Sequence, residues 1–171
     1  RKNAASSIGP LADSVSKRLS QLEADSVPAR LWKGDPFLWA PAKDVAGQRE
    51  VTIRMGWLDS TDKARQKLKE WQAFAKEVRK TKIDRVLVLG MGGSSLTAEV
   101  FSSLMAAAGL EASLSLAILD STDPAQVKLA AEQYPPDKSL YIVASKSGGT
   151  AEVMAAFDYF WKLSKKDGSR F

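Results

Sequence analysis

The sequence contains neither histidine nor cysteine among its 171 residues. Without cysteine, the chain can form no disulfide framework and no thiolate nucleophile. The lack of histidine removes the usual general acid–base near neutral pH and excludes a histidine-based triad or zinc site. We therefore expect no metal and no cofactor, and the missing cysteines suit a cytoplasmic protein.

Long apolar runs are missing as well. The longest candidate, Leu104–Leu119, is interrupted by Gly109, Glu111, Ser113 and Ser115. A membrane-spanning helix needs about 18 consecutive apolar residues. We expect neither a membrane segment nor, since no secretory signal is visible, a secreted protein.

The basic residues are concentrated in two stretches, residues 63–82 and 162–170, and the net charge is +5. We interpret both stretches as solvated helix faces rather than as a nucleic-acid surface, because charge runs on helices usually face water. We expect no nucleic-acid partner. A mildly basic domain also suits an anionic metabolite.

Two short apolar runs each lead directly into a glycine-rich loop and a helical pattern. The first run, Arg85–Leu89, ends at Gly90, Gly92 and Gly93. The second run, Leu140–Ala144, is followed by the segment Ser145-Lys146-Ser147-Gly148-Gly149-Thr150. In a strand–loop–helix unit, glycines let the backbone approach a phosphate, and the helix N-terminus offers free N–H groups. Each loop therefore predicts an anion site.

The order of these patterns predicts an α/β fold with a doubly wound parallel sheet in three α/β/α layers. Residues 83–171 show strands at 85–89, 114–119 and 140–144, helices at 94–108, 124–133 and 150–165, and the start of a fourth strand at Arg170-Phe171. Residues 1–82 read as a helical lead-in that packs on the sheet, with helices at 10–24, from about 28, and at 60–82. Irregular or extended segments are expected at 37–41 and 51–57, with Trp39, Met55 and Trp57 as apolar anchors.

If the strand order is 2-1-3, the two loops lie side by side at the carboxyl ends of the strands, where ligands of doubly wound sheets bind. Backbone N–H groups of both loops, the hydroxyls of Ser94, Ser95, Ser145, Ser147 and Thr150, and the Lys146 cation would then form a cup for a phosphate monoester. Glu152 is ambiguous, because an acid in the first turn of a helix is favourable without any substrate.

These residues resemble the sugar isomerase (SIS) domain of the glucose-6-phosphate isomerase family. Leu89-Gly90-Met91-Gly92-Gly93-Ser94 matches the family's first loop, Ile-Gly-x-Gly-Gly-Ser, and the segment from Ser145 to Val153 matches its second, Ser-Lys-Thr-x-x-Thr-x-Glu-Thr. The turn Asp120–Pro124 is similar to the family's turn after the second strand. Pro28–Trp32 and Gly56–Leu58 resemble the isomerase half of bifunctional transaldolase/glucose-6-phosphate isomerase proteins.

The resemblance implies a phosphosugar substrate, with Ser94 near the sugar and Ser145, Ser147 and Thr150 at the phosphate. Gly92 and Gly93 are expected among the residues that bind the substrate or its phosphate. It places Lys146 near the sugar and gives Glu152 a supporting role. Ser147 replaces the family's Thr and keeps its hydroxyl, whereas Gly148-Gly149 replaces a bulkier pair, which leaves the sugar open. The family's catalytic Glu base, Arg and ring-opening His or Lys match no position here. We therefore expect no catalytic residue in this chain.

Two other functions remain open at this point: a non-catalytic SIS sensor of sugar phosphates, and a dinucleotide-binding oxidoreductase. The second rests on the partial Gly-x-Gly-x-x-Gly pattern at residues 90–95 and on Asp120 after the second strand, but Ser95 stands where that pattern has Gly or Ala. The start at Arg1 and the unfinished sheet predict a piece of a longer polypeptide that contacts its own remainder or forms a homo-oligomer.

Overall fold

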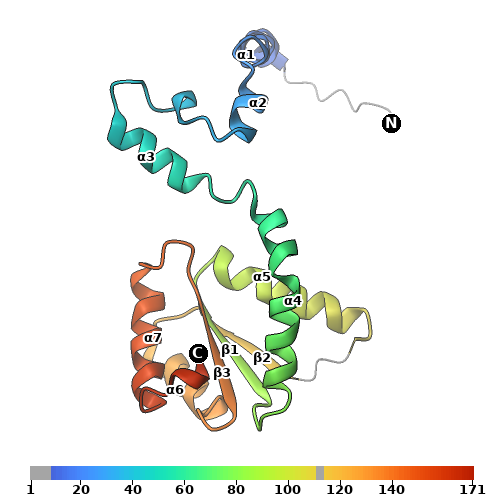
Figure 1. Ribbon diagram of the computed structural model, residues 1–171, viewed down its shortest axis with the longest axis vertical. Helices are drawn as coiled ribbons and strands as arrows, with labels where there is room; N and C mark the ends of the chain where they lie inside the picture. Colours follow the sequence, from blue (N-terminus) through green and yellow to red (C-terminus); the bar gives the residue numbers. More distant parts are fainter. Residues whose placement is uncertain (1–8, 111–113) are drawn as a thin grey trace. The chain divides into compact units, whose positions relative to one another are not determined.

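The computed structural model describes residues 9–110 and 114–171. The chain divides into two compact units, Arg1–Glu70 and Trp71–Phe171. The division falls inside helix α4, Ser60–Val78, so that the end of this helix belongs to the second unit. Figure 1 shows the described part of the helical first unit in blue to green and the α/β second unit in green to red. None of the helices in the described ranges is both long and apolar enough to cross a membrane.

The first unit is built from short helices and tight turns. It contains the helices α1 Ala12–Ala24, α2 Val27–Trp32 and α3 Val45–Arg54, with 3-10 turns at Gly9–Leu11 and Pro36–Leu38. Asp35 organises the bend after α2: it pairs with Arg30 at 2.7 Å and accepts a hydrogen bond from the Phe37 N–H. These contacts lower the pKa of Asp35, with the Arg30 hydrogen bond as the largest cause.

Helix α3 corrects the prediction of an irregular or extended segment at residues 51–57 over residues 51–54, whereas residues 55–57 lie in the turn that follows the helix. Asp44 caps this helix by accepting a hydrogen bond from the Gly47 N–H at 2.8 Å. The helix buries none of its residues, so it carries no apolar stripe that a periodicity argument could detect. Of the three predicted anchors only Met55 is buried, since Trp39 and Trp57 remain 57% and 53% exposed.

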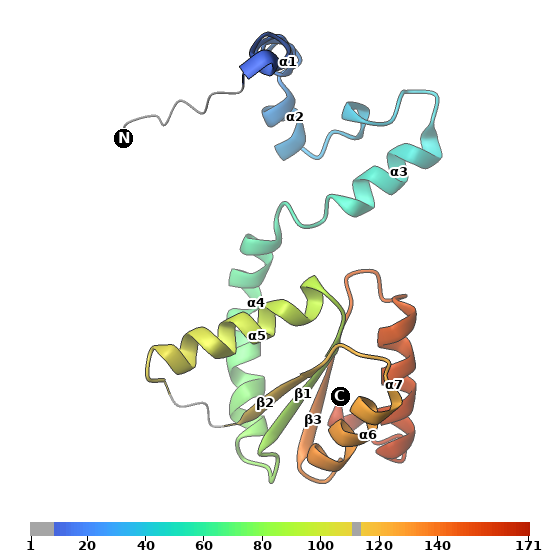
Figure 2. The ribbon, with the colours of Figure 1, turned by 180° about the vertical axis from the view of Figure 1, so that it is seen from behind.

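The second unit contains a three-stranded parallel sheet in the order β2-β1-β3. Its strands are β1 Arg85–Gly90, β2 Ser115–Leu119 and β3 Ser139–Ala144, and its connecting helices are α5 Gly93–Ala107, α6 Pro124–Gln133 and α7 Ala151–Leu163. Figures 1 and 2 show α6 and α7 on one face of the sheet and α5 with the end of α4 on the other. The predicted α/β class, parallel sheet and strand order are confirmed.

Apolar side chains cover both faces of the sheet. The face toward α6 and α7 carries the larger buried cluster, made of Leu87, Leu89, Leu119, Tyr134, Tyr141 and Phe160. Val78 at the end of α4 packs with Val86 and Leu140 on the opposite face. Because β1 is buried on both faces, it reads as a continuous apolar run in the sequence. The sheet therefore holds the carboxyl ends of β1 and β3 in a defined position.

The predicted fourth strand is wrong for the residues described. Gly168–Arg170 form a 3-10 turn, in which Asp167 accepts hydrogen bonds from the N–H and hydroxyl of Ser169. The Phe171 ring packs against the Tyr141 ring, with 5.3 Å between the two ring centroids, and Phe171 does not pair with the sheet. Strand β3 is consequently an edge strand among the described residues, with Ile142 43% exposed.

Candidate anion-binding site

The two glycine loops leave the sheet next to each other. Gly90, the last residue of β1, pairs in register with Ala144, the last residue of β3. A Cβ atom on Gly90 would lie 3.3 Å from the Ala144 Cβ and 3.4 Å from the carbonyl carbon of Ser94. Because these three segments are in close contact, the adjacency predicted for the two loops is present in the structure.

The first loop turns directly into α5. Gly92 is the N-cap of this helix and has φ = +56°, a backbone conformation that glycine adopts without strain. Gly93 is exposed and begins the helix, and Ser94 is half-buried in its first turn. Ser95 differs from the prediction that its hydroxyl faces a ligand: it is buried, and its hydroxyl donates to the Gly92 carbonyl at 2.9 Å.

The second loop is held together by its own hydroxyl groups. The Ser145 and Thr150 oxygens lie 3.1 Å apart, and Ser145 also accepts a hydrogen bond from the Gly148 N–H. Ser147 accepts one from the Gly149 N–H at 3.2 Å. A hydroxyl that accepts a bond keeps its own hydrogen for donation. The Ser147 hydrogen and one hydrogen of the Ser145–Thr150 pair are therefore available for donation to a further group.

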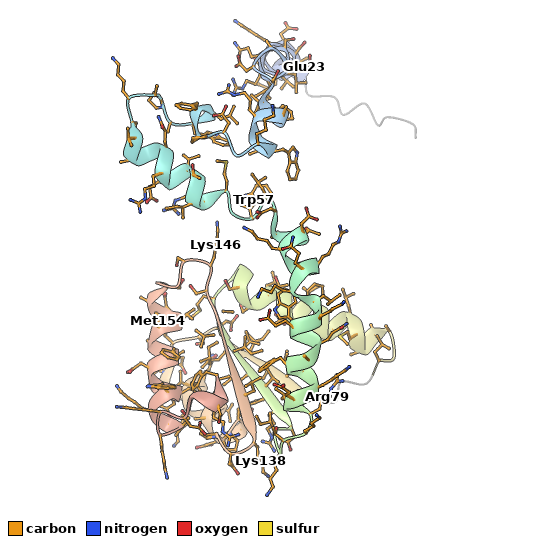
Figure 3. The ribbon with its side chains drawn as sticks, viewed as in Figure 1. Glu23, Trp57, Arg79, Lys138, Lys146 and Met154 are labelled. Atoms are coloured by element: carbon orange, nitrogen blue, oxygen red, sulfur yellow. The ribbon has the colours of Figure 1, made fainter. Side chains whose placement is uncertain are left out.

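The second loop and the first turn of α7 carry the predicted site residues Lys146, Thr150 and Glu152, which differ in their exposure and contacts. Thr150 is the N-cap of α7, and its side chain makes no capping bond to that helix. Lys146 is exposed, and in Figure 3 its side chain extends from the loop away from the sheet. Glu152 is exposed in the first turn of α7, where a negative charge interacts favourably with the helix dipole. The structure thus groups Ser145, Ser147 and Thr150 in one hydrogen-bonded loop and leaves Lys146 and Glu152 outside that network.

A third turn, after β2, reaches the same edge of the sheet. Asp123 caps α6 by accepting hydrogen bonds from the Ala125 and Gln126 N–H groups, both at 3.0 Å. Ser121 in turn accepts one from the Asp123 N–H. The acid of this turn that would imitate a ribose-binding residue, Asp120, is exposed at the end of β2. The polar residues Ser121 and Asp123 of this turn are therefore explained by their hydrogen bonds at the start of α6.

The fold and the paired loops define the second unit as an α/β domain with a candidate anion site at the carboxyl ends of its strands. No protein-family model matches the chain. Parts of it are similar to three proteins named as glucose-6-phosphate isomerases. The first, a probable glucose-6-phosphate isomerase of Haloquadratum walsbyi, is 36% identical over 72 residues, which are 42% of this chain and 16% of the relative.

The other two relatives give similar values. A probable glucose-6-phosphate isomerase of Natronomonas pharaonis is 39% identical over 74 residues, 43% of this chain and 16% of the relative. Glucose-6-phosphate isomerase 1 of Rhodococcus jostii is 35% identical over 111 residues, 64% of this chain and 18% of the relative. The chain thus spans less than a fifth of each relative. These partial matches support the relationship to glucose-6-phosphate isomerases, while the SIS domain and the transaldolase fusion stay predictions.

Proposed function

We propose that this protein contains the sugar-phosphate-binding part of an aldose–ketose isomerase that interconverts glucose 6-phosphate and fructose 6-phosphate in the cytoplasm. The observation that carries the proposal is the register of Gly90 with Ala144, which brings two glycine- and hydroxyl-rich loops to one edge of the sheet. The names of the three partial relatives support the choice of sugar.

In this proposal the second loop binds the phosphate. The Ser147 hydroxyl and one hydroxyl of the hydrogen-bonded Ser145–Thr150 pair donate to phosphate oxygens, together with N–H groups at the start of α7. A phosphate accepts hydrogen bonds from all sides, and bonds to a charged group are stronger than those between neutral groups. Gly92, Gly93 and Ser94 of the first loop lie toward the sugar, Lys146 supplies a cation at the rim, and Glu152 supports the loop from α7.

The isomerase reaction itself moves a proton between neighbouring carbons through an enediolate. By resemblance, it requires a Glu base, an Arg that steadies the developing charge, and a His or Lys that opens the ring. None of these roles falls on a residue of this chain. We therefore propose that residues 1–171 bind substrate without turning it over, and a coupled assay of fructose 6-phosphate formation on this polypeptide tests that point.

Thermal unfolding in the presence of ligands tests the proposed substrate class. A ligand that binds only the native state raises the melting temperature. We expect glucose 6-phosphate and fructose 6-phosphate to raise it, and unphosphorylated glucose and nicotinamide dinucleotides at equal concentration to leave it unchanged. A shift with NAD and none with either sugar phosphate would favour the dinucleotide-binding oxidoreductase and overturn the proposal.

A further inference from the structure

The side chain of Ser95 is buried under the first glycine loop and does not lie on the solvent-facing side of that loop. Only 3% of the residue is exposed, and its hydroxyl donates to the Gly92 carbonyl at 2.9 Å. A hydroxyl in this position cannot reach a ligand above the loop. Its contact is instead with the backbone group that defines the turn from β1 into α5.

The Gly92 carbonyl is held by three donors. Besides the Ser95 hydroxyl, it accepts hydrogen bonds from the Ser95 N–H at 3.1 Å and the Leu96 N–H at 3.0 Å. All three donors belong to the first turn of α5, so the carbonyl oxygen points into that helix. The orientation of the peptide group between Gly92 and Gly93 is fixed as a result.

This orientation determines where the Gly93 N–H points. In a planar trans peptide, the C=O and the following N–H point in opposite directions. Because the Gly92 carbonyl points into α5, the Gly93 N–H points out of the helix N-terminus, at the carboxyl end of β1. None of the described residues accepts a hydrogen bond from it.

We propose that Ser95 is a positioning residue, whose buried hydroxyl holds the Gly92–Gly93 peptide so that the Gly93 N–H donates to the bound phosphosugar. The inference rests on the proposed function, since it assigns a role within the same site. Ser95 acts through the backbone and touches no substrate. It also accounts for a serine at the position where the dinucleotide pattern requires a small residue without a hydroxyl.

Hydroxyls of helical serines and threonines often donate to a carbonyl one turn back, so a matched comparison is needed. Thr97 offers it on the same helix. Its hydroxyl donates to the Gly93 carbonyl at 3.1 Å, but the residue is exposed and its bond does not involve the Gly92–Gly93 peptide oxygen. Removing the Thr97 hydroxyl therefore deletes a similar bond without releasing the peptide in question.

The test compares Ser95→Ala, Ser95→Thr and Thr97→Ala by calorimetric titration with glucose 6-phosphate. We expect Ser95→Ala to weaken binding about three- to ten-fold, the effect of one hydrogen bond. Ser95→Thr keeps the hydroxyl and should restore the affinity, and Thr97→Ala should change it less than two-fold. A purely structural Ser95 would lower the melting temperature and leave the affinity of the folded protein unchanged, which would overturn the inference.

A nuclear magnetic resonance titration of the unaltered protein gives a second readout that does not depend on any variant folding. Addition of glucose 6-phosphate should shift the Gly93 amide resonance strongly. Binding without a Gly93 shift would overturn the role of Ser95 and leave the proposed function intact. Absence of any binding to the unaltered protein would instead overturn the proposed function, and the role of Ser95 with it.

Discussion

The hydroxyl oxygens of Ser145 and Thr150 lie 3.1 Å apart and close the second loop across five residues. Thr150 is the N-cap of α7, a position at which threonine usually bonds to its own helix. Here its side chain makes no such bond and faces Ser145 instead. The first turn of α7 therefore keeps its N–H groups free of a side-chain cap, which is the arrangement an anion site requires.

A side chain at Gly90 is expected to crowd the end of β3. A Cβ at this position would lie 3.3 Å from the Ala144 Cβ and 3.4 Å from the Ala144 carbonyl oxygen, so the ends of β1 and β3 would have to shift slightly apart. We predict that Gly90→Ala lowers the free energy of unfolding by about 1–3 kcal/mol, the usual cost of overpacking. Chemical denaturation measures this change.

Gly149→Ala is the matched control. A Cβ on Gly149 meets no atom within 4 Å, and its backbone is not in the positive-φ region. We expect its free energy of unfolding to change by less than about 0.5 kcal/mol, as at other exposed sites. Equal effects of the two substitutions would contradict the close contact between the two loops.

Tyr141 should make the stability of the protein fall at high pH. Burial raises the pKa of its hydroxyl from 10.0 to about 12. Between these values the unfolded chain loses the Tyr141 proton while the folded protein retains it. The folded state then binds more protons, so the free energy of unfolding decreases as the pH rises from 10 to 12. Denaturation curves at several pH values in this range test the prediction.

Two phenylalanine variants isolate the contribution of Tyr141 from that of other groups. Tyr141→Phe should flatten the pH dependence, although it also removes the hydrogen bond to the Tyr134 carbonyl and lowers stability at neutral pH. Tyr159→Phe, at a residue that is 42% exposed, should keep the dependence of the unaltered protein. The prediction fails if both variants show the same slope.

The outer edge of β3 is expected to associate with other polypeptide, either a second copy or a further part of the same protein. Ile142 and Val143 are 43% and 37% exposed, and the strand carries no charge or proline that would protect an edge. We predict that residues 1–171 alone form concentration-dependent assemblies. Light scattering over a dilution series measures them.

Ile142→Lys should reduce this association, because a charge on an edge strand opposes pairing with another strand. Leu129→Lys adds the same charge to α6, at a residue that is 52% exposed, and should leave the association unchanged. A chain that stays monomeric at every concentration, or equal effects of the two substitutions, would contradict the prediction.

The parts of the fold with strong local signals could be predicted from the sequence. The start of α6 was predictable to the residue, because Pro124 is a residue type that favours the first position of a helix. The sequence left the strand order as a condition for the two loops to lie side by side, and the order β2-β1-β3 meets that condition. In contrast, α3 buries none of its residues, and its sequence shows no apolar residues at helical spacing from which the helix could be predicted. The turn at Gly168–Arg170 depends on the hydrogen bonds that Asp167 accepts from Ser169, which the sequence pattern did not predict.

The candidate site was predictable in its residue types but not in the orientation of its groups. Ser94 and Ser95 are adjacent and chemically alike, yet Ser95 is buried against the Gly92 carbonyl and Ser94 is not. Which hydroxyl turns inward depends on the direction in which α5 leaves the sheet. The inward Ser145–Thr150 contact likewise depends on how the loop folds back on itself, and residue spacing does not specify it.

We propose above that the second loop binds the phosphate through its hydroxyls, and calorimetric titration of glucose 6-phosphate into the double variant Ser147→Ala, Thr150→Ala tests this binding. The double variant Ser102→Ala, Ser103→Ala, which removes two hydroxyls from α5 in a cleft beside β2, serves as the matched control. We predict that the loop variant binds more weakly by roughly 1–3 kcal/mol, from lost hydrogen bonds to a charged group, while the control binds like the unaltered protein. An unchanged affinity in the loop variant would contradict the account.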